Sequence, residues 1–331
     1  LKKGLFWYFF QRNLEPCLVK EERETPCQYL SKYENNAHLF RVTYYAKRIN
    51  VEIYHVLCDG TGGIRFLHVL VGCYLNRKYG LNLPVEIGIE GKSNKELKTD
   101  AYALCSRTTK KTRSPIQEKA YQIRGYRFEK GICSYINGSM AVKEISALAK
   151  AYGGTITMYL ATVLLFSIYE GFYKFEESRL PIVLSLPVNL RNIFQADMIR
   201  NFFVAVDIGV NFSEKEYTFA EVFQLVKKQL QEKTEPAYLQ EKVRCNINAQ
   251  HNMALRFTPL FAKNLGLNLV YQAGVQSHTC TFSNLGVFTF PAAYSDYVTT
   301  VDCGISPSPG HPLKCTIASY NGNLIFTFTS C

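Results

Sequence analysis

A histidine, an aspartate and several glycines lie close together in the stretch VEIYHVLCDGTGG, which begins at residue 51. Within it, His55, Asp59 and Gly60 form the pattern H-x-x-x-D-G. A histidine beside the N-terminus of a helix is favoured in its neutral form, because the partial positive charge there opposes protonation. A neutral imidazole accepts protons, so His55 is a candidate general base.

The same histidine also has a structural interpretation. A single histidine on an apolar strand face is often a core residue, and side-chain alternation would place His55 on the same face as Ile53. Asp59 is costly to bury without a positive partner. We therefore predict that a buried Asp59 pairs with an arginine from a distant segment, and Arg191 in PVNLR is the candidate. The glycines from Gly60 onward let the backbone turn and approach a neighbour closely.

Several other catalytic motifs are absent from the sequence. It contains no G-x-S-x-G of serine hydrolases and no phosphate loop of the G-x-x-x-x-G-K or G-x-G-x-x-G type. It also contains no H-E-x-x-H, no two histidines four residues apart and no C-x-x-C. We therefore expect no metal site.

The flanking sequence predicts the elements that position these residues. Two strand-like runs at residues 39–46 and 49–57 are expected to form a hairpin, whose second strand carries His55. From Ile64 the apolar residues follow a helical spacing that ends at Gly80, a typical C-cap. A strand, a glycine turn and a helix therefore follow one another around the motif.

The rest of the chain mixes strands and helices. Residues 5–10 are either a strand or a buried helical turn, and Thr218-x-x-Glu221 is a capping box that opens a helix. Further strands are predicted at residues 131–136, 180–188, 202–210, 278–285, 297–303 and 313–328, the last as a hairpin of two strands joined at Asn321-Gly322-Asn323. Further helices are predicted at residues 142–152, 239–256, 260–273 and from 155 onward. We expect an α/β or α+β fold with mixed sheets in two halves. A polar connection at residues 88–122 divides the halves into residues 1–121 and 122–331.

Composition indicates an ordinary globular protein, with 47% hydrophobic and 20% charged residues among 331. The net charge of +11 suits a solvated basic surface, an anionic membrane, nucleic acid or a phosphate-bearing ligand. Nucleic acid is disfavoured, because no basic run is interleaved with aromatic residues. Eleven cysteines without a C-x-x-C pair indicate free thiols in a reducing compartment, which predicts a cytoplasmic protein.

The apolar run at residues 156–166 is shorter than a bilayer-spanning helix, so we expect a buried helix and no transmembrane segment. The chain begins at Leu1, within an apolar pattern, and ends directly after a predicted strand. We expect further protein segments before and after it.

Three segments carry a resemblance to a known family. YHVLCDGTGGIRFL resembles the active-site motif of the chloramphenicol acetyltransferase-like superfamily, which includes plant acyl-CoA-dependent acyltransferases and the condensation domains of peptide synthetases. PVNLRNIF with MIRNFF, and TFSNLG at residues 281–286, agree with it in order and spacing. Together they resemble the alcohol O-acetyltransferase branch most closely. Tyr54 stands where condensation domains usually have a second histidine, which disfavours peptide-bond condensation.

The resemblance implies two chloramphenicol acetyltransferase-like subdomains around a central tunnel. It implies CoA-dependent O-acyl transfer of an acetyl or other short acyl group to a small-molecule alcohol, without a covalent intermediate. Acyl-CoA, such as acetyl-CoA, would be the cosubstrate, with no permanently bound cofactor. His55 would be the base, while Asp59 would turn away and pair with Arg191. Ser283 and Asn284 are candidate oxyanion donors or tunnel residues, although SNLG can equally be a plain turn.

Three alternatives remain open. The acyl group can come from an acyl carrier protein, as in a condensation domain. The chain can be a non-catalytic homologue that binds a ligand or a partner. Finally, His55 can be a structural residue in an unrelated fold.

Overall fold

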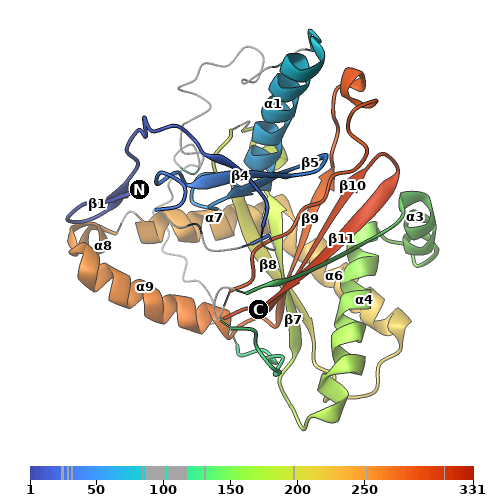
Figure 1. Ribbon diagram of the computed structural model, residues 1–331. Coiled ribbons are helices and arrows are strands. Elements are labelled where there is room, and N and C mark those ends of the chain that lie inside the picture. Colours follow the sequence, from blue (N-terminus) through green and yellow to red (C-terminus); the bar gives the residue numbers. More distant parts are fainter. Residues whose placement is uncertain are drawn as a thin grey trace.

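The computed structural model describes residues 1–23, 26–27, 30, 33–83, 85, 102, 118–129, 132–196, 198–250, 252–308 and 310–331. Its largest sheet contains β6 (Ser134–Ala141), β7 (Ile182–Asn189), β8 (Phe203–Val210), β9 (Cys280–Val287), β10 (Leu313–Tyr320) and β11 (Asn323–Ser330). The spatial order of this sheet is β6-β11-β10-β9-β7-β8 (Figure 1). β9 runs parallel to both β7 and β10, and the other pairs are antiparallel. The predicted mixed α/β architecture is therefore confirmed.

One face of this sheet packs against helices α3 (Val142–Ala151), α4 (Ile156–Gly171) and α6 (Phe219–Lys233) (Figure 1). α6 begins with the predicted capping box, because Thr218 accepts a hydrogen bond from the Glu221 amide and Glu221 accepts one from the Thr218 amide. α4 begins at the N-cap Thr155, whose side chain accepts a bond from the Met158 amide. Both helix starts agree with the sequence prediction.

The helical stretch Ile156–Phe175 is longer than the sequence indicated, because α4 continues into the short helix η2 (Tyr173–Phe175). It has 20 residues and a mean hydropathy of 1.3, so among the described residues it is the stretch whose length and composition would allow it to cross a membrane. In this fold Leu164, Leu165 and Ile168 lie in the main core. α4 therefore serves as a core helix packed on β7 and α6.

A three-stranded sheet comes from the first part of the chain, with the order β3-β4-β5. Its strands are β3 (Val19–Glu21), β4 (Phe40–Tyr45) and β5 (Arg48–Ile53), and the antiparallel pairing of β4 with β5 confirms the predicted hairpin. β5 ends earlier than predicted, at Ile53. Leu57 continues the alternation of Val51 and Ile53 in the sequence, but a turn replaces the strand pairing here.

Helix α1 (Gly60–Tyr79) follows this turn and begins four residues before the predicted start at Ile64. Asp59 is its N-cap, so the glycines form the first helical turn rather than a loop. The helix ends at the predicted C-cap Gly80, whose φ of 64° is left-handed. Ile64 and Leu67 pack with residues of the large sheet in a second apolar cluster, which holds α1 against that sheet.

The second half of the chain differs from the prediction in two places. The helix predicted at residues 239–256 is divided into α7 (Pro236–Gln250) and α8 (Met253–Phe257), and α9 (Leu260–Val275) follows. Residues 297–303 form no strand. The apolar side chains of this segment pack in the core instead, since Val298 and Val301 lie in the second apolar cluster.

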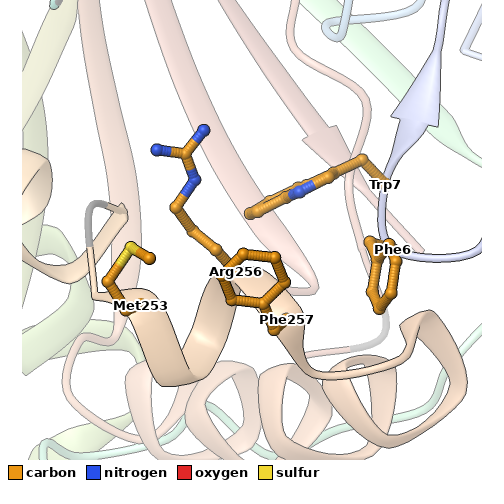
Figure 2. A pocket seen from close by; sticks show the side chains of 5 residues that line it. All are labelled: Phe6, Trp7, Met253, Arg256 and Phe257. Atoms are coloured by element: carbon orange, nitrogen blue, oxygen red, sulfur yellow. The ribbon is translucent and has the colours of Figure 1, made fainter.

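The N-terminal segment lies against α8 and α9 and is neither a long strand nor a buried helical turn. Only Lys2–Lys3 (β1) and Tyr8–Phe9 (β2) pair as strands. The Lys263 ammonium lies 3.4 Å from the centroid of the Trp7 ring and donates to the Phe6 carbonyl. Phe6 and Trp7 line a cavity of about 350 Å³ together with Met253, Arg256 and Phe257 (Figure 2).

The predicted polar connection at residues 88–122 lies mostly outside the described residues, which include only residues 102 and 118–122 of it. Tyr102 donates to the Phe203 carbonyl of β8, and Tyr121 donates its amide to the Pro181 carbonyl beside β7. Both of these described residues of the connection therefore bond to the backbone of the large sheet or of its flank.

Candidate active site

His55 lies in a tight turn between β5 and α1, and its side chain is exposed. The Tyr54 amide still donates to the Leu39 carbonyl, one residue before β4, but the Leu57 amide donates to the Tyr54 carbonyl at 2.9 Å and closes the turn. His55 therefore occupies the second position of the turn, off the strand face that the sequence predicted. Its ring centroid lies 5.5 Å from that of Phe203 on β8. The histidine is accessible to a ligand and is not sealed in the core.

Asp59 is buried, with 9% of its side chain exposed, and its carboxylate accepts four hydrogen bonds. Oδ1 accepts from the Gly62 amide, and Oδ2 accepts from the Phe202 amide. Arg191 supplies the other two, at 2.8 and 2.9 Å, in a bidentate ion pair. All the acceptor positions of the carboxylate are occupied, so Asp59 has no free oxygen for a substrate.

Arg191 lies directly after β7, at the start of α5 (Arg191–Phe194), and is 7% exposed. Its guanidinium makes five hydrogen bonds, matching its five N–H donors. Besides Asp59, the partners are Asn189 and the carbonyls of Met198 and Arg200. The ion pair thus joins the start of α1, where Asp59 lies, to the segment between α5 and β8. Asp59 and Arg191 are 132 residues apart in the sequence.

That segment in turn holds the backbone of His55. Asn201 donates from its side-chain amide to the His55 carbonyl at 2.8 Å, one residue before the Phe202 amide that bonds Asp59. The buried Oδ1 of Asn201 has no protein partner among the described residues. The segment MIRNFF was part of the sequence pattern, but the sequence did not identify Asn201 or Phe203 as residues that contact His55. Asn201 is 146 residues and Phe203 is 148 residues from His55 in the sequence, so these contacts leave no local signal.

In any reaction that uses His55 as a base, we expect Asn201→Ala to lower kcat about 10- to 100-fold while leaving KM nearly unchanged, because a small displacement of His55 weakens proton transfer more than binding. Asn201→Asp keeps the size of the side chain but loses the N–H donor, so it should behave like alanine. Steady-state kinetics with unchanged circular dichroism would test this. A wild-type kcat in the aspartate variant would contradict the positioning role.

The glycines of the motif allow close contacts around α1. A Cβ at Gly60 would lie 2.6 Å from a methyl group of Leu285, and one at Gly62 would lie 2.2 Å from the Ile199 carbonyl oxygen. A Cβ at Gly63 would meet only Ile53, at 3.4 Å. Gly62 thus brings α1 against the segment that holds Asp59, and Gly60 brings it against the end of β9.

Gly62→Ala should destabilise the fold by about 1–3 kcal/mol, since backbone atoms must move to admit the methyl group. Gly63→Ala has room and should stabilise it by about 0.5–1 kcal/mol, because alanine is favoured over glycine inside a helix. Urea unfolding of the two variants provides the comparison. Equal changes in stability for the two variants would show that the Ile199 carbonyl leaves room for a methyl group at position 62.

The two oxyanion candidates face different sides of β9. Ser283 is buried, and Leu285, two residues on and therefore on the same face, contacts Gly60. Asn284 instead donates to the Thr157 hydroxyl at the start of α4 and accepts from the Gly286 amide. The Asn284 side chain therefore stabilises a turn on the α4 side. Of the pair, Ser283 is the one on the face of the sheet that meets α1.

Within the described residues, no group of three or more His, Cys, Asp and Glu side chains is arranged to hold a metal ion. The ten described cysteines are all free thiols. Burial raises the pKa of Cys58, next to Asp59, to about 11. This thiol is therefore protonated near neutral pH and is a poor nucleophile.

No protein-family model and no curated protein sequence matches this chain. Solved structures do match it. TRI101 of F. graminearum, complexed with coenzyme A and deoxynivalenol, has a TM-score of 0.58 at 11% identity, covering 88% of this chain and 66% of that one. The polyketide synthase associated protein 5 of Mycobacterium tuberculosis has a TM-score of 0.52 at 12% identity, covering 95% and 75%.

TRI3, a trichothecene 15-O-acetyltransferase of Fusarium sporotrichioides, has a TM-score of 0.51 at 13% identity, covering 88% of this chain and 65% of that one. The chain thus spans about two thirds of the length of the TRI101 and TRI3 chains. Identities this low relate folds rather than activities. Over 88% of its length, the chain has a mixed α/β fold similar to that of TRI101.

Proposed function

We propose that this protein is a CoA-dependent O-acyltransferase that moves an acetyl or other short acyl group from a thioester to an alcohol. The observation that carries the proposal is the exposed turn bearing His55, which Asn201 and the buried pair of Asp59 and Arg191 hold in place. The fold shared with acyltransferases supports it. The finer assignment to the alcohol O-acetyltransferase branch is part of the proposal and rests on the three sequence segments.

In the proposed reaction, His55 accepts the proton of the acceptor hydroxyl while the oxygen attacks the thioester carbonyl. The tetrahedral intermediate then collapses, the carbon–sulfur bond breaks, and the imidazolium returns the proton to the departing thiolate. The products are an ester and free CoA, and no acyl group is attached to the protein. Ser283 is the proposed donor to the oxyanion, because its hydroxyl lies on the face of β9 that meets α1.

Asp59 has a structural role in this mechanism. Its carboxylate is fully bonded within the protein, so it orients the turn and neutralises Arg191 without touching the substrate. The excess of basic residues, with a net charge of +11, would favour the approach of the anionic phosphates of CoA. In this proposal the basic residues attract CoA, and no nucleic acid is needed to account for the positive charge.

The direct test offers acetyl-CoA with a panel of alcohols and amines and follows the release of free thiol. Release that depends on an alcohol, with an ester as the product, is the expected result. No release with any acyl-CoA would refute a CoA donor. The same panel with an acyl carrier protein as donor would then distinguish a carrier-dependent enzyme from a non-catalytic binding protein.

A further inference from the structure

Helix α9 lies at one edge of the molecule, next to α8 and the N-terminal segment, and is made mostly of apolar residues (Figure 1). Lys263 is its one charged residue. Only Leu260, Lys263 and Val275 of this helix are buried, and every residue from 264 to 273 is exposed. A helix with apolar residues on most of its sides is normally found inside a core or in a membrane. α9 therefore combines the composition of a buried helix with an exposed position.

The most exposed apolar side chains of α9 form one row. Phe261, Leu265 and Leu269 are spaced four residues apart, so they lie one above the other on the same side of the helix. Their exposed fractions are 78%, 67% and 66%. Asn264, on another side of the helix, donates to the Tyr8 hydroxyl at 3.2 Å. The N-terminal segment thus attaches to α9 away from the row and leaves the row open to solvent.

The N-terminal segment and α8 extend this apolar surface. The Leu260 amide donates to the Leu5 carbonyl at 2.8 Å, which places Leu5 beside the start of the row. The Phe6 ring contacts that of Phe257 on α8, with centroids 6.4 Å apart. Leu5 and Phe257 are both exposed. A large exposed apolar surface marks a site of interaction. We call it the outer face, and it consists of Leu5, Phe257, Phe261, Leu265 and Leu269.

The segments that build the outer face carry only positive charge. Residues 1–14 and 242–295 contain no Asp or Glu. Lys2 and Lys3 are exposed on β1, which pairs with β2 beside α9, and Arg256 is exposed next to Phe257. Cations around an apolar surface complement the headgroups of anionic lipids. A symmetric contact with a second copy of the chain would instead bring these cations face to face. The charge therefore favours a lipid surface over a second copy.

The aromatic residues and the length of α9 fit a position at the membrane surface. Trp7, the single tryptophan of the sequence, and Tyr8 are both exposed beside α9. Tryptophan and tyrosine prefer the boundary between lipid headgroups and acyl chains. α9 has 16 residues, whereas a helix that crosses a bilayer needs about 20. This helix is therefore suited to lie along the membrane surface rather than to cross it.

We infer that the outer face binds the surface of a bilayer that contains anionic lipids. α9 lies in the plane of the interface, with Phe261, Leu265 and Leu269 directed into the acyl region. Lys2, Lys3 and Arg256 contact the headgroups. The inference does not depend on His55 or on the proposed acyl transfer, because it concerns a different surface of the molecule.

The first test measures co-sedimentation of the protein with phosphatidylcholine vesicles and with vesicles of equal parts phosphatidylcholine and phosphatidylglycerol. The wild-type protein should bind the anionic vesicles at least about tenfold more tightly. Leu265→Gln should lower this binding about tenfold, because the polar side chain does not favour the acyl region. Leu148→Gln is the matched control, since Leu148 is an exposed leucine on α3, on the opposite side of the molecule (Figure 1). It should leave the binding unchanged.

A second pair of variants tests the charges. Lys2→Gln combined with Lys3→Gln should lower binding to the anionic vesicles about fivefold or more and leave binding to the neutral vesicles unchanged. Lys143→Gln, at an exposed position of α3, should have no effect. Added salt should weaken the binding of the wild-type protein to the anionic vesicles, because it screens the attraction.

Fluorescence of Trp7 identifies the surface that binds. Its emission should shift to shorter wavelength with the anionic vesicles, and brominated lipids should quench it. The inference is overturned if neither kind of vesicle binds, if binding leaves Trp7 unquenched, or if Leu265→Gln and Leu148→Gln have equal effects. A dimer in sedimentation velocity that Leu265→Gln dissociates, without vesicle binding, would also overturn it and would assign the outer face to contacts between copies.

Discussion

Replacement of His55 by alanine should lower the acceptor-dependent release of CoA by about 10²- to 10⁴-fold, the range expected when a positioned general base is lost. The ring is exposed in its turn and touches Phe203, so the substitution removes little buried area. The melting temperature should therefore stay close to that of the wild-type protein. Thiol release at saturating acetyl-CoA and alcohol is the measurement.

His38→Ala is the matched control for this prediction. His38 belongs to the same part of the chain, where its ring packs on Phe40 and lies 2.9 Å from the Glu15 carbonyl. Its removal should change the rate less than twofold. Acceptor-dependent release that survives in His55→Ala would remove the base assignment and leave the histidine as a structural residue.

Breaking the pair of Asp59 and Arg191 should have the largest effect on stability. Asp59→Ala leaves the guanidinium buried and unpaired, which costs about 3–5 kcal/mol, and it also removes the N-cap of α1. Domains are commonly stable by only about 5–15 kcal/mol, so this is a large fraction of the total. Urea unfolding followed by circular dichroism would measure the loss.

A double-mutant cycle separates the pair from its surroundings. Arg191→Met alone leaves a buried carboxylate, whereas the combination with Asp59→Ala leaves neither charge unpaired, so the double variant should be more stable than the sum of the single losses predicts. Lys174→Ala, which removes an ion pair with Glu170 on the surface, should cost less than about 1 kcal/mol. Additive effects of Asp59→Ala and Arg191→Met would show that the two side chains do not stabilise the fold as a pair.

Local signals in the sequence predicted much of the fold. The hairpin of β4 and β5, the capping box of α6 and the C-terminal hairpin at Asn321-Gly322-Asn323 all formed as expected. Each depends on hydrogen bonds or periodicity within a few residues, so the chain contains the information locally. The strand predicted at residues 297–303 is wrong for the opposite reason, because Val298 and Val301 pack in the second apolar cluster with residues distant in the sequence, a contact that local apolar spacing does not distinguish from a strand.

The sequence alone was enough to select His55, Asp59 and Arg191 as candidates. The chemistry of each side chain gave the reason: an imidazole beside an Asp-Gly turn can accept a proton, and a buried carboxylate needs a positively charged partner. Only the folded chain placed His55 in an exposed turn, brought Asn201 to its carbonyl and directed Asn284 towards α4. Those placements depend on contacts between segments more than 100 residues apart, which leave no periodic signal in the sequence. Packing of α1 against the large sheet, through glycines that admit close approach, brings these distant segments together.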